Sequence, residues 1–282
     1  MSPTVPAWRI RDGALETPLV MGIVNVTPDS FSDGGLWLGK SAIEHGLELV
    51  EAGADIVDVG GESTRPGATP VDEAEELRRV LTVVEALASE GAVVSIDSMK
   101  PTVARAAVEA GARIVNDVGG LADPAMRSTV ADSGAGVVIM HMQGEPRTMQ
   151  LDPRYDDVVD DVAAFLRARV DDAIAAGIHP AGIVLDPGVG FGKTLEHNLE
   201  LIRRMRELAG LGHHLLVGAS RKRFLGTILG LEDPRQRDRA TSILSALLFE
   251  RGVGIVRVHD VAGTRESLAL VRAIVSGREG NA

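Results

Sequence analysis

The sequence contains no cysteine, so disulfide bonds and metal sites with thiolate ligands are excluded. It also has no apolar run near the roughly 18 residues of a membrane-spanning helix. The segment MSPTVPAWRIRDG, residues 1–13, lacks the apolar stretch of a signal peptide. We therefore expect a cytoplasmic protein that has no membrane partner.

Basic residues are also scarce, because 29 Lys and Arg face 40 Asp and Glu, for a formal net charge of −11. Proteins that bind nucleic acid need a basic surface for the phosphate backbone. We therefore expect no nucleic-acid partner. A few local cations would still be enough to hold a small anionic substrate.

Short apolar runs are the main feature that the sequence does contain. The 282 residues have a hydrophobic fraction of 45%, which is typical of a globular protein with a full core. Eight runs rich in Val and Ile end in polar or Gly-rich residues, and their composition indicates buried parallel strands. These runs occupy residues 19–27, 55–64, 93–98, 113–120, 136–144, 182–193, 214–222 and 254–260.

Helical patterns lie between the runs, most clearly over 72–90 and 157–177, where apolar residues recur three and four positions apart. Gly-Ala pairs just before three of the predicted strands are typical of the turns that join a helix to the next strand. Eight such βα units in about 260 residues predict a single (β/α)₈ TIM barrel, with an open doubly wound sheet as the alternative. We expect the barrel to span 19–276, with an extension at 1–18 packed on it and a loose tail at 277–282.

Polar or ionisable residues follow all eight predicted strands, where barrels of this kind place their catalytic residues. They are Asn25; Glu62, Ser63, Thr64 and Arg65; Asp97; Asn116 and Asp117; His141; Asp186; Lys222; and Arg257, His259 and Asp260. We interpret His141 as structural rather than catalytic. The GVGFGK segment lacks the spacing of a nucleotide P-loop, so its glycines indicate a tight turn.

Two chemistries are indicated at these strand ends. Asp97, Asn116 and Asp186 supply hydrogen-bond acceptors that suit a flat heterocycle with adjacent N–H donors, such as a pterin or guanine edge. Cationic and donor side chains at the last two strands, Lys222, Arg257 and His259, suit a phosphate. The combination predicts a pocket for a heterocycle that carries phosphate.

Eight segments together resemble the dihydropteroate synthases, from about residue 21 to residue 261. They are NVTPDSFSDGG, GGESTRPGA, SIDS, NDV, HMQGEPRTMQ, LDPGVGFGK, GASRKRF and RVHD. This family joins p-aminobenzoate to 6-hydroxymethyl-7,8-dihydropterin diphosphate, which gives 7,8-dihydropteroate and pyrophosphate in folate synthesis, and it is the target of sulfonamides. The resemblance also implies a Mg²⁺ cofactor and a homodimer formed through the last helices, about 240–251 and 264–276.

The resemblance implies a role for each matching residue. The pterin would be bound by Asp97, Asn116, Met140, Asp186 and Lys222, and the diphosphate by Asn25, Arg257 and His259, with Asn25 also on Mg²⁺. The p-aminobenzoate pocket would be formed by Phe31, Thr64, Arg65, Pro66, Ser220 and Arg221. Asp33, Asp97 and Lys222 would act in catalysis, Asp33 by meeting the departing diphosphate. Arg223 departs from the family pattern, in which Ser is common at that position.

The first loop, which begins at Asn25, fits this chemistry. A pterin cation formed by loss of diphosphate would be captured by water if it were exposed, and a loop that brings Asp33 and Phe31 over the site would limit that access. Three other functions remain as alternatives. They are a corrinoid-linked methyltetrahydrofolate methyltransferase, which needs no diphosphate clamp, a Schiff-base aldolase using Lys222, and a non-catalytic pterin-binding homologue.

Overall fold

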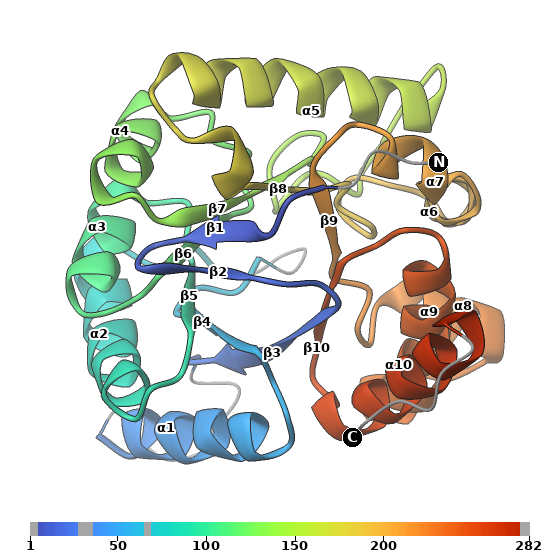
Figure 1. The fold of residues 1–282 in the computed structure, drawn as a ribbon. Coiled ribbons are helices and arrows are strands. Elements are labelled where there is room, and N and C mark those ends of the chain that lie inside the picture. Colours follow the sequence, from blue (N-terminus) through green and yellow to red (C-terminus); the bar gives the residue numbers. More distant parts are fainter. Residues whose placement is uncertain (1–4, 28–35, 65–68, 277–282) are drawn as a thin grey trace.

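A closed barrel of eight parallel strands forms the centre of the molecule (Figure 1). The computed structural model describes residues 5–27, 36–64 and 69–276. The strands are β3 (Leu19–Asn25), β4 (Ile56–Gly60), β5 (Val94–Asp97), β6 (Ile114–Asp117), β7 (Gly136–Met140), β8 (Ile183–Asp186), β9 (His214–Val217) and β10 (Ile255–Val258). Each of the eight predicted runs contains one of them, so the barrel prediction is confirmed. The open-sheet alternative is wrong, because β10 pairs with both β9 and β3.

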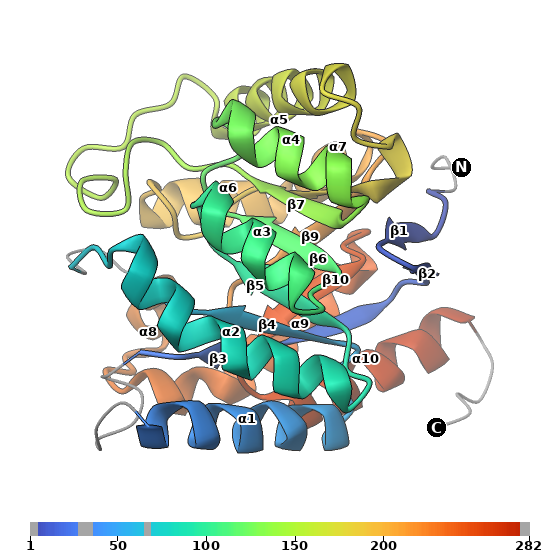
Figure 2. The same ribbon diagram turned by 90° about the vertical axis from the view of Figure 1, so that its left-hand side faces the viewer.

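Helices surround the barrel, as the view from its side shows (Figure 2). They are α1 (Leu36–Glu51), α2 (Glu73–Ser89), α3 (Pro101–Glu109), α4 (Pro124–Ser133), α5 (Val158–Ala175), α6 (Leu195–Arg203), α7 (Met205–Ala209), α8 (Arg223–Leu229), α9 (Asp238–Glu250) and α10 (Val261–Ser276). Two short 3₁₀ helices, η2 (Pro180–Gly182) and η3 (Pro234–Arg237), complete the connections. The helices predicted over 72–90 and 157–177 are therefore α2 and α5.

Local sequence explains where several of these helices begin and end. The Asp72 side chain accepts a hydrogen bond from the Glu75 backbone N–H at 2.8 Å and so caps the first turn of α2. After α4, Gly134 adopts φ = +67° and ends the helix. That conformation is easy for glycine and strained for most other residues. Gly53 before β4 and Gly111 before β6 also have positive φ values, +96° and +116°. The Gly-Ala pairs therefore mark true helix ends.

A hairpin of two short antiparallel strands, β1 (Trp8–Ile10) and β2 (Gly13–Leu15), lies across the N-terminal end of the barrel. Its Trp8 is fully buried, and the indole N–H donates to the Gly182 carbonyl oxygen at 3.0 Å. Trp8 and Ile10 share an apolar cluster with barrel residues such as Met21 and Ile114. The hairpin therefore closes the end of the barrel that faces away from the predicted site. The domain boundaries drawn from the sequence stay a prediction.

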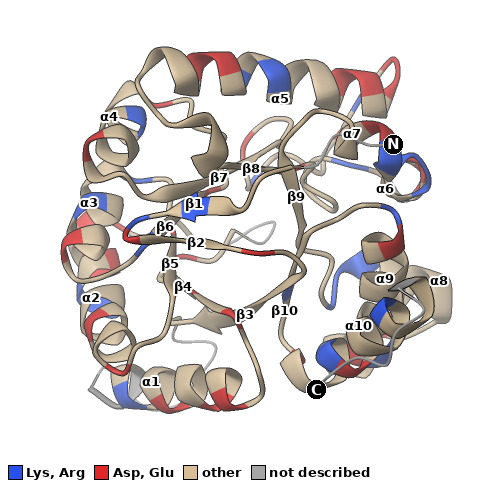
Figure 3. Cartoon of the chain, in the orientation of Figure 1, with Lys and Arg blue, Asp and Glu red and all other residues tan. Residues whose placement is uncertain are grey.

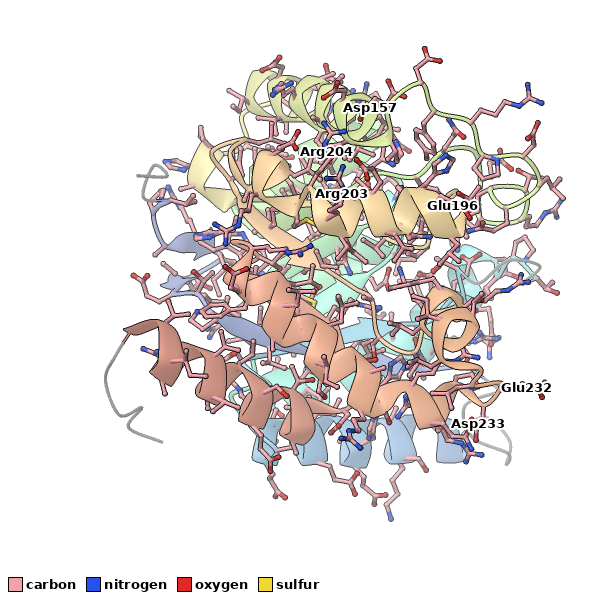
Figure 4. The ribbon with its side chains drawn as sticks, turned by 90° about the vertical axis from the view of Figure 1, so that its right-hand side faces the viewer. Asp157, Glu196, Arg203, Arg204, Glu232 and Asp233 are labelled. Atoms are coloured by element: carbon pink, nitrogen blue, oxygen red, sulfur yellow. The ribbon has the colours of Figure 1, made fainter. Side chains whose placement is uncertain are left out.

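Charged side chains are found mainly on the surrounding helices (Figure 3). One ion-pair group joins two of them: Arg204, at the end of α6, contacts Asp157 at the start of α5 at 2.6 Å and Glu207 at 2.7 Å (Figure 4). In the described part of the chain, no helix is both long enough and apolar enough to cross a membrane.

Candidate active site

A cavity lies at the C-terminal ends of the barrel strands and has about 480 Å³ of empty space. Nine residues predicted for the site line it together. They are Thr64, Asp97, Asn116, Met140, Asp186, Ser220, Lys222, Arg257 and His259. They come from separate strands and from the loops that follow them, and the closed barrel brings these together at one rim. The polar side chains that follow the strands therefore meet in one pocket.

Arg257 lines one side of this cavity and contacts two carboxylates there. Its Nη2 donates to Asp97 at 2.8 Å, and its Nε donates to Asp58 at 2.5 Å. Asn116 Nδ2 also donates to Asp58, at 3.0 Å. One guanidinium thus bridges two carboxylates, and Asp58 fixes both Arg257 and Asn116.

Asp58 is a site residue that the sequence reasoning missed. It lies inside β4 with no exposed surface, and its second oxygen, Oδ1, has no hydrogen-bond partner among the described residues. A carboxylate inside the apolar run DIVDVG needs a buried cationic or donor partner. That isolated charge was the signal from which the residue could have been found.

Asp186 and Lys222 form the other side of the cavity. Asp186 Oδ1 accepts a hydrogen bond from the Gly188 backbone N–H at 2.7 Å. Lys222 Nζ donates to the Val189 carbonyl oxygen and lies 4.1 Å from the centre of the Phe191 ring. Phe191 lines the cavity too, although it was not predicted. The ammonium is therefore held from below by the loop that follows β8.

Burial controls the protonation of these groups. It raises the pKa of Asp97 to about 7, against the opposing effect of the Arg257 charge. Burial also raises the pKa of Asp186, opposed by the Lys222 ammonium. For Lys222 burial acts in the other direction and lowers the pKa to about 7. Both signs follow from the cost of placing a charge in a site of low polarity.

Ser220 and His259 lie together at the β9 and β10 end of the cavity. Ser220 Oγ is 2.9 Å from His259 Nδ1, and it accepts a hydrogen bond from the His259 backbone N–H at 3.1 Å. These contacts fix the His259 imidazole just after the end of β10, the strand that carries Arg257. These side chains provide hydrogen-bond donors suited to an anion.

Two predicted residues are placed elsewhere. Arg221 forms a two-pronged ion pair with Asp238, with N–O distances of 2.6 and 2.7 Å, and does not line the cavity. Asn25 ends β3 at the same rim but is not among the lining residues. Four further predictions, Phe31, Asp33, Arg65 and Pro66, lie outside the described residues.

The relatives of this chain identify the chemistry of such a pocket. The model of the family described as "Pterin binding enzyme" matches residues 21–259. A dihydropteroate synthase of Mycobacterium leprae is 50% identical over 263 residues, which cover 90% of this chain and 92% of the relative. The chain belongs to the dihydropteroate synthase family.

Solved structures of dihydropteroate synthases have the same fold and are similar in sequence. The Xanthomonas albilineans enzyme with 4-aminobenzoic acid has a TM-score of 0.90 and 45% identity, and the match covers 96% of this chain and 99% of that one. The Yersinia pestis enzyme with a sulfonamide drug has a TM-score of 0.91 and 42% identity, with 96% and 100% covered. The Xanthomonas enzyme has also been solved with 7,8-dihydropteroate, with a TM-score of 0.85 and 44% identity over 92% of this chain and 94% of that one.

The donors at the rim fit Mg²⁺ only if the substrate supplies most of its ligands. Among the described residues, no group of three or more His, Asp or Glu side chains is arranged to hold a metal. Mg²⁺ prefers oxygen ligands and is commonly held by one or two protein groups plus substrate phosphates. The amide oxygen of Asn25 at the end of β3 is a donor of that kind. The residues present therefore fit an ion that arrives with a diphosphate.

Proposed function

We propose that this cavity carries out the dihydropteroate synthase reaction with Asp97, Asn116, Asp186 and Lys222 on the pterin and Arg257 and His259 on the diphosphate. In this reaction, 6-hydroxymethyl-7,8-dihydropterin diphosphate and p-aminobenzoate give 7,8-dihydropteroate and pyrophosphate. The observation that carries the proposal is one cavity lined both by buried acceptors and by cationic or donor groups next to them. The family relationship supports the reaction. The residue roles come from the resemblance, and the shared cavity is compatible with them.

The pterin subsite is proposed to use Asp186 for the paired N–H donors of the amino-pyrimidinone edge. Asn116 is held by Asp58, so its amide oxygen is available to a ring N–H. Lys222, already fixed by Val189 and Phe191, would donate to the pterin carbonyl. Met140 lines the same cavity and supplies an apolar contact for the ring.

The diphosphate is proposed to lie toward β9 and β10. Arg257 uses Nε and Nη2 for Asp58 and Asp97, which leaves Nη1 for a phosphate oxygen. His259, oriented by Ser220, and Asn25 would complete this end, and Asn25 would also hold Mg²⁺. When bound, Mg²⁺ would neutralise charge on the diphosphate and so favour its departure.

The p-aminobenzoate subsite is proposed around Thr64 and Ser220, which line the cavity. Phe31, Arg65 and Pro66 are assigned to it by the resemblance alone. The carboxylate of Asp97 lies 2.8 Å from Arg257, between the proposed pterin and diphosphate positions. It would stabilise positive charge on the reduced ring while the C–O bond to the diphosphate breaks. The aryl amine then forms the C–N bond and loses one proton to solvent.

The assay that tests this function follows dihydropteroate and pyrophosphate together. We expect both products only when the pterin diphosphate and p-aminobenzoate are present. A methyltransferase would instead use methyltetrahydrofolate and a corrinoid, and a non-catalytic homologue would bind the pterin without releasing pyrophosphate. Either of those results would contradict the proposal.

Metal removal gives a second test of the same site. Because Mg²⁺ would be held mainly by the substrate, EDTA should abolish turnover and added Mg²⁺ should restore it. Pterin binding without the diphosphate should change little, since the proposed pterin contacts involve no metal. Full turnover in metal-free buffer would contradict the proposed cofactor.

Sulfonamides are proposed to compete with p-aminobenzoate, since a sulfonamide complex is known for the Yersinia relative. A homodimer through α9 and α10 is also part of this proposal. These helices pack against each other on one side of the molecule (Figure 4). Exposed apolar side chains include Ile243 and Leu247 on α9 and Leu270 and Ile274 on α10. The cytoplasmic location and the absence of nucleic-acid and membrane partners stay predictions.

A further inference from the structure

Lys193 is a buried lysine outside the cavity lining. Only 3% of its surface is exposed, and it lies near the end of the loop that connects β8 to α6. Its Nζ donates to the Phe191 carbonyl oxygen at 2.9 Å and lies 3.0 Å from His141 Nδ1. Burial, together with the nearby Lys193 charge, lowers the pKa of His141 to about 3. The imidazole is therefore neutral, and burial likewise lowers the pKa of Lys193, to about 7.

The 187–192 loop fits tightly between the end of β7 and Lys222. Gly188 and Gly190 have φ values of +65° and +86°, which favour glycine. A Cβ on Gly188 would meet the His141 carbonyl oxygen, and one on Gly190 would lie 2.6 Å from Lys222 Cδ. A small movement of this loop would therefore move the groups that hold Lys222.

One backbone group and one side chain of the same loop contact Lys222. The Val189 carbonyl oxygen accepts from its Nζ, and the Phe191 ring lies 4.1 Å below it. Lys193 in turn holds the carbonyl of Phe191. A continuous path thus leads from Lys193 through Phe191 to the ammonium in the cavity.

We propose that Lys193 is a positioning residue, which fixes the 187–192 loop and thereby orients Lys222 toward the pterin. This inference rests on the proposed function of the cavity. Other groups hold the loop at other points: Tyr155 Oη donates to the Gly192 carbonyl oxygen and Gln150 Nε2 to that of Gly190, each at 2.8 Å. Of these three side chains, only Lys193 donates a hydrogen bond to Phe191, the residue whose ring contacts Lys222.

The main test replaces Lys193 with methionine, which keeps the length and removes the ammonium. Lys40→Met is the matched control, because Lys40 is 69% exposed on α1. We expect Lys193→Met to raise the dissociation constant of the pterin diphosphate, measured by calorimetry, about tenfold, as for one lost hydrogen bond. The kcat should change less than about threefold, because the lost contact supports substrate binding rather than bond breaking.

A double-mutant cycle separates this role from a merely structural one. If Lys193 acts through Lys222, Lys193→Met should add less than about threefold to the loss in a Lys222→Met background. Lys193→Gln, which keeps a donor for the Phe191 carbonyl, should recover part of the affinity, and it replaces Lys193→Met in the cycle if the latter does not fold.

Two outcomes would overturn the inference. One is wild-type pterin affinity in Lys193→Met, and the other is a fully additive loss in the double variant. The wild-type protein decides the proposed function separately, because its formation of dihydropteroate does not depend on either variant.

Discussion

Asp97 and Asp186 are both buried carboxylates, yet their surroundings predict different effects of removing the charge. Asp186 is held by a backbone N–H of the β8 loop, whereas Asp97 is paired with the Arg257 guanidinium. The hydrogen bonds that Asp186 is proposed to accept from the pterin edge would exist before and after ionisation, so they would contribute uniform binding. The deprotonated carboxylate of Asp97 is proposed to stabilise the charge that develops as the C–O bond breaks.

We therefore expect Asp97→Asn to lower kcat by about 10²–10³ with a smaller loss of pterin affinity. Asp186→Asn should mainly raise the pterin dissociation constant. Asparagine keeps the shape and removes the charge in both variants. Steady-state kinetics and calorimetry on both proteins make the comparison. Equal losses of affinity and activity in Asp97→Asn would show that this carboxylate only binds.

The lowered pKa of Lys222 leads us to expect that pterin binding depends on pH. Its pKa of about 7 in the free protein means that the Lys222 side chain is neutral in about half of the molecules at pH 7. Asp186 and Arg257 act on it with opposite signs, and Lys193 lies under the same loop. Because the bound pterin needs the ammonium as a donor, binding takes up a proton. Affinity should therefore fall as pH rises from 7 to 9, by up to about tenfold per unit.

Calorimetric titrations across this pH range test that assignment. Lys222→Met should bind weakly at every pH and lose the part of the decline above pH 7 that loss of the Lys222 proton causes. Lys40→Met should keep the wild-type slope. A wild-type affinity that does not change between pH 7 and pH 9 would contradict an ammonium donor.

The positions of single residues were predictable where they follow a strand. Asp97 and Asp186 end β5 and β8, and Asn116 is the penultimate residue of β6. Parallel strands bring these carboxyl ends to one rim. Asp58 and Phe191 were missed for different reasons. Asp58 lies within a strand, and the inward direction of its side chain depends on the barrel register. Phe191 reaches the cavity because of the path of a glycine-rich loop, which the spacing of residues does not define.

Lys100 joins three elements at the edge of the same rim. Its Nζ forms ion pairs with Glu62, after β4, and with Glu76 on α2, and Lys100 itself precedes α3. The Glu76 side chain is 1% exposed, and a buried carboxylate needs a polar or charged partner. Removing one partner of a buried pair costs about 3–5 kcal/mol, whereas replacing both by apolar groups often costs little.

Lys100→Met should therefore lower the free energy of unfolding by about 3–5 kcal/mol, measured by urea denaturation. A second substitution, Glu76→Met, should restore part of that loss. Lys40→Met removes an exposed ion pair with Glu44 and should change stability by less than about 1 kcal/mol. If Lys100→Met is as stable as this control, the group does not hold β4, α2 and α3 together.

At the level of elements, strong periodicity made the sequence informative. The eight apolar runs and the amphipathic patterns of α2 and α5 are long enough to specify their type. The β1–β2 hairpin has strands of only three residues each and no such pattern. Its structure depends on burial of Trp8 against the barrel, which is a tertiary effect.

The whole molecule combines a repeated βα unit with exposed apolar side chains on α9 and α10. Repetition explains why the closed barrel was predictable, since each unit specifies its neighbour. Apolar side chains exposed on α9 and α10 do not follow from that repeat, because the outer helices of a barrel otherwise present polar residues to water. Leu270 is 64% exposed and Ile274 is 71% exposed, one turn apart on α10.

A second copy of the chain would cover the apolar side chains of α9 and α10. A charged residue introduced among them should therefore separate the two copies. We expect the wild-type protein to have twice its chain mass of 29.7 kDa by light scattering at micromolar concentration. Leu270→Glu should weaken dimerisation at least about tenfold, because association would bury an unpaired carboxylate. Leu151→Glu is the matched control, since Leu151 is 81% exposed in the segment between β7 and α5 and should leave the dimer intact. A monomeric wild-type protein, or a Leu270→Glu variant that remains dimeric, would show that α9 and α10 do not form the interface.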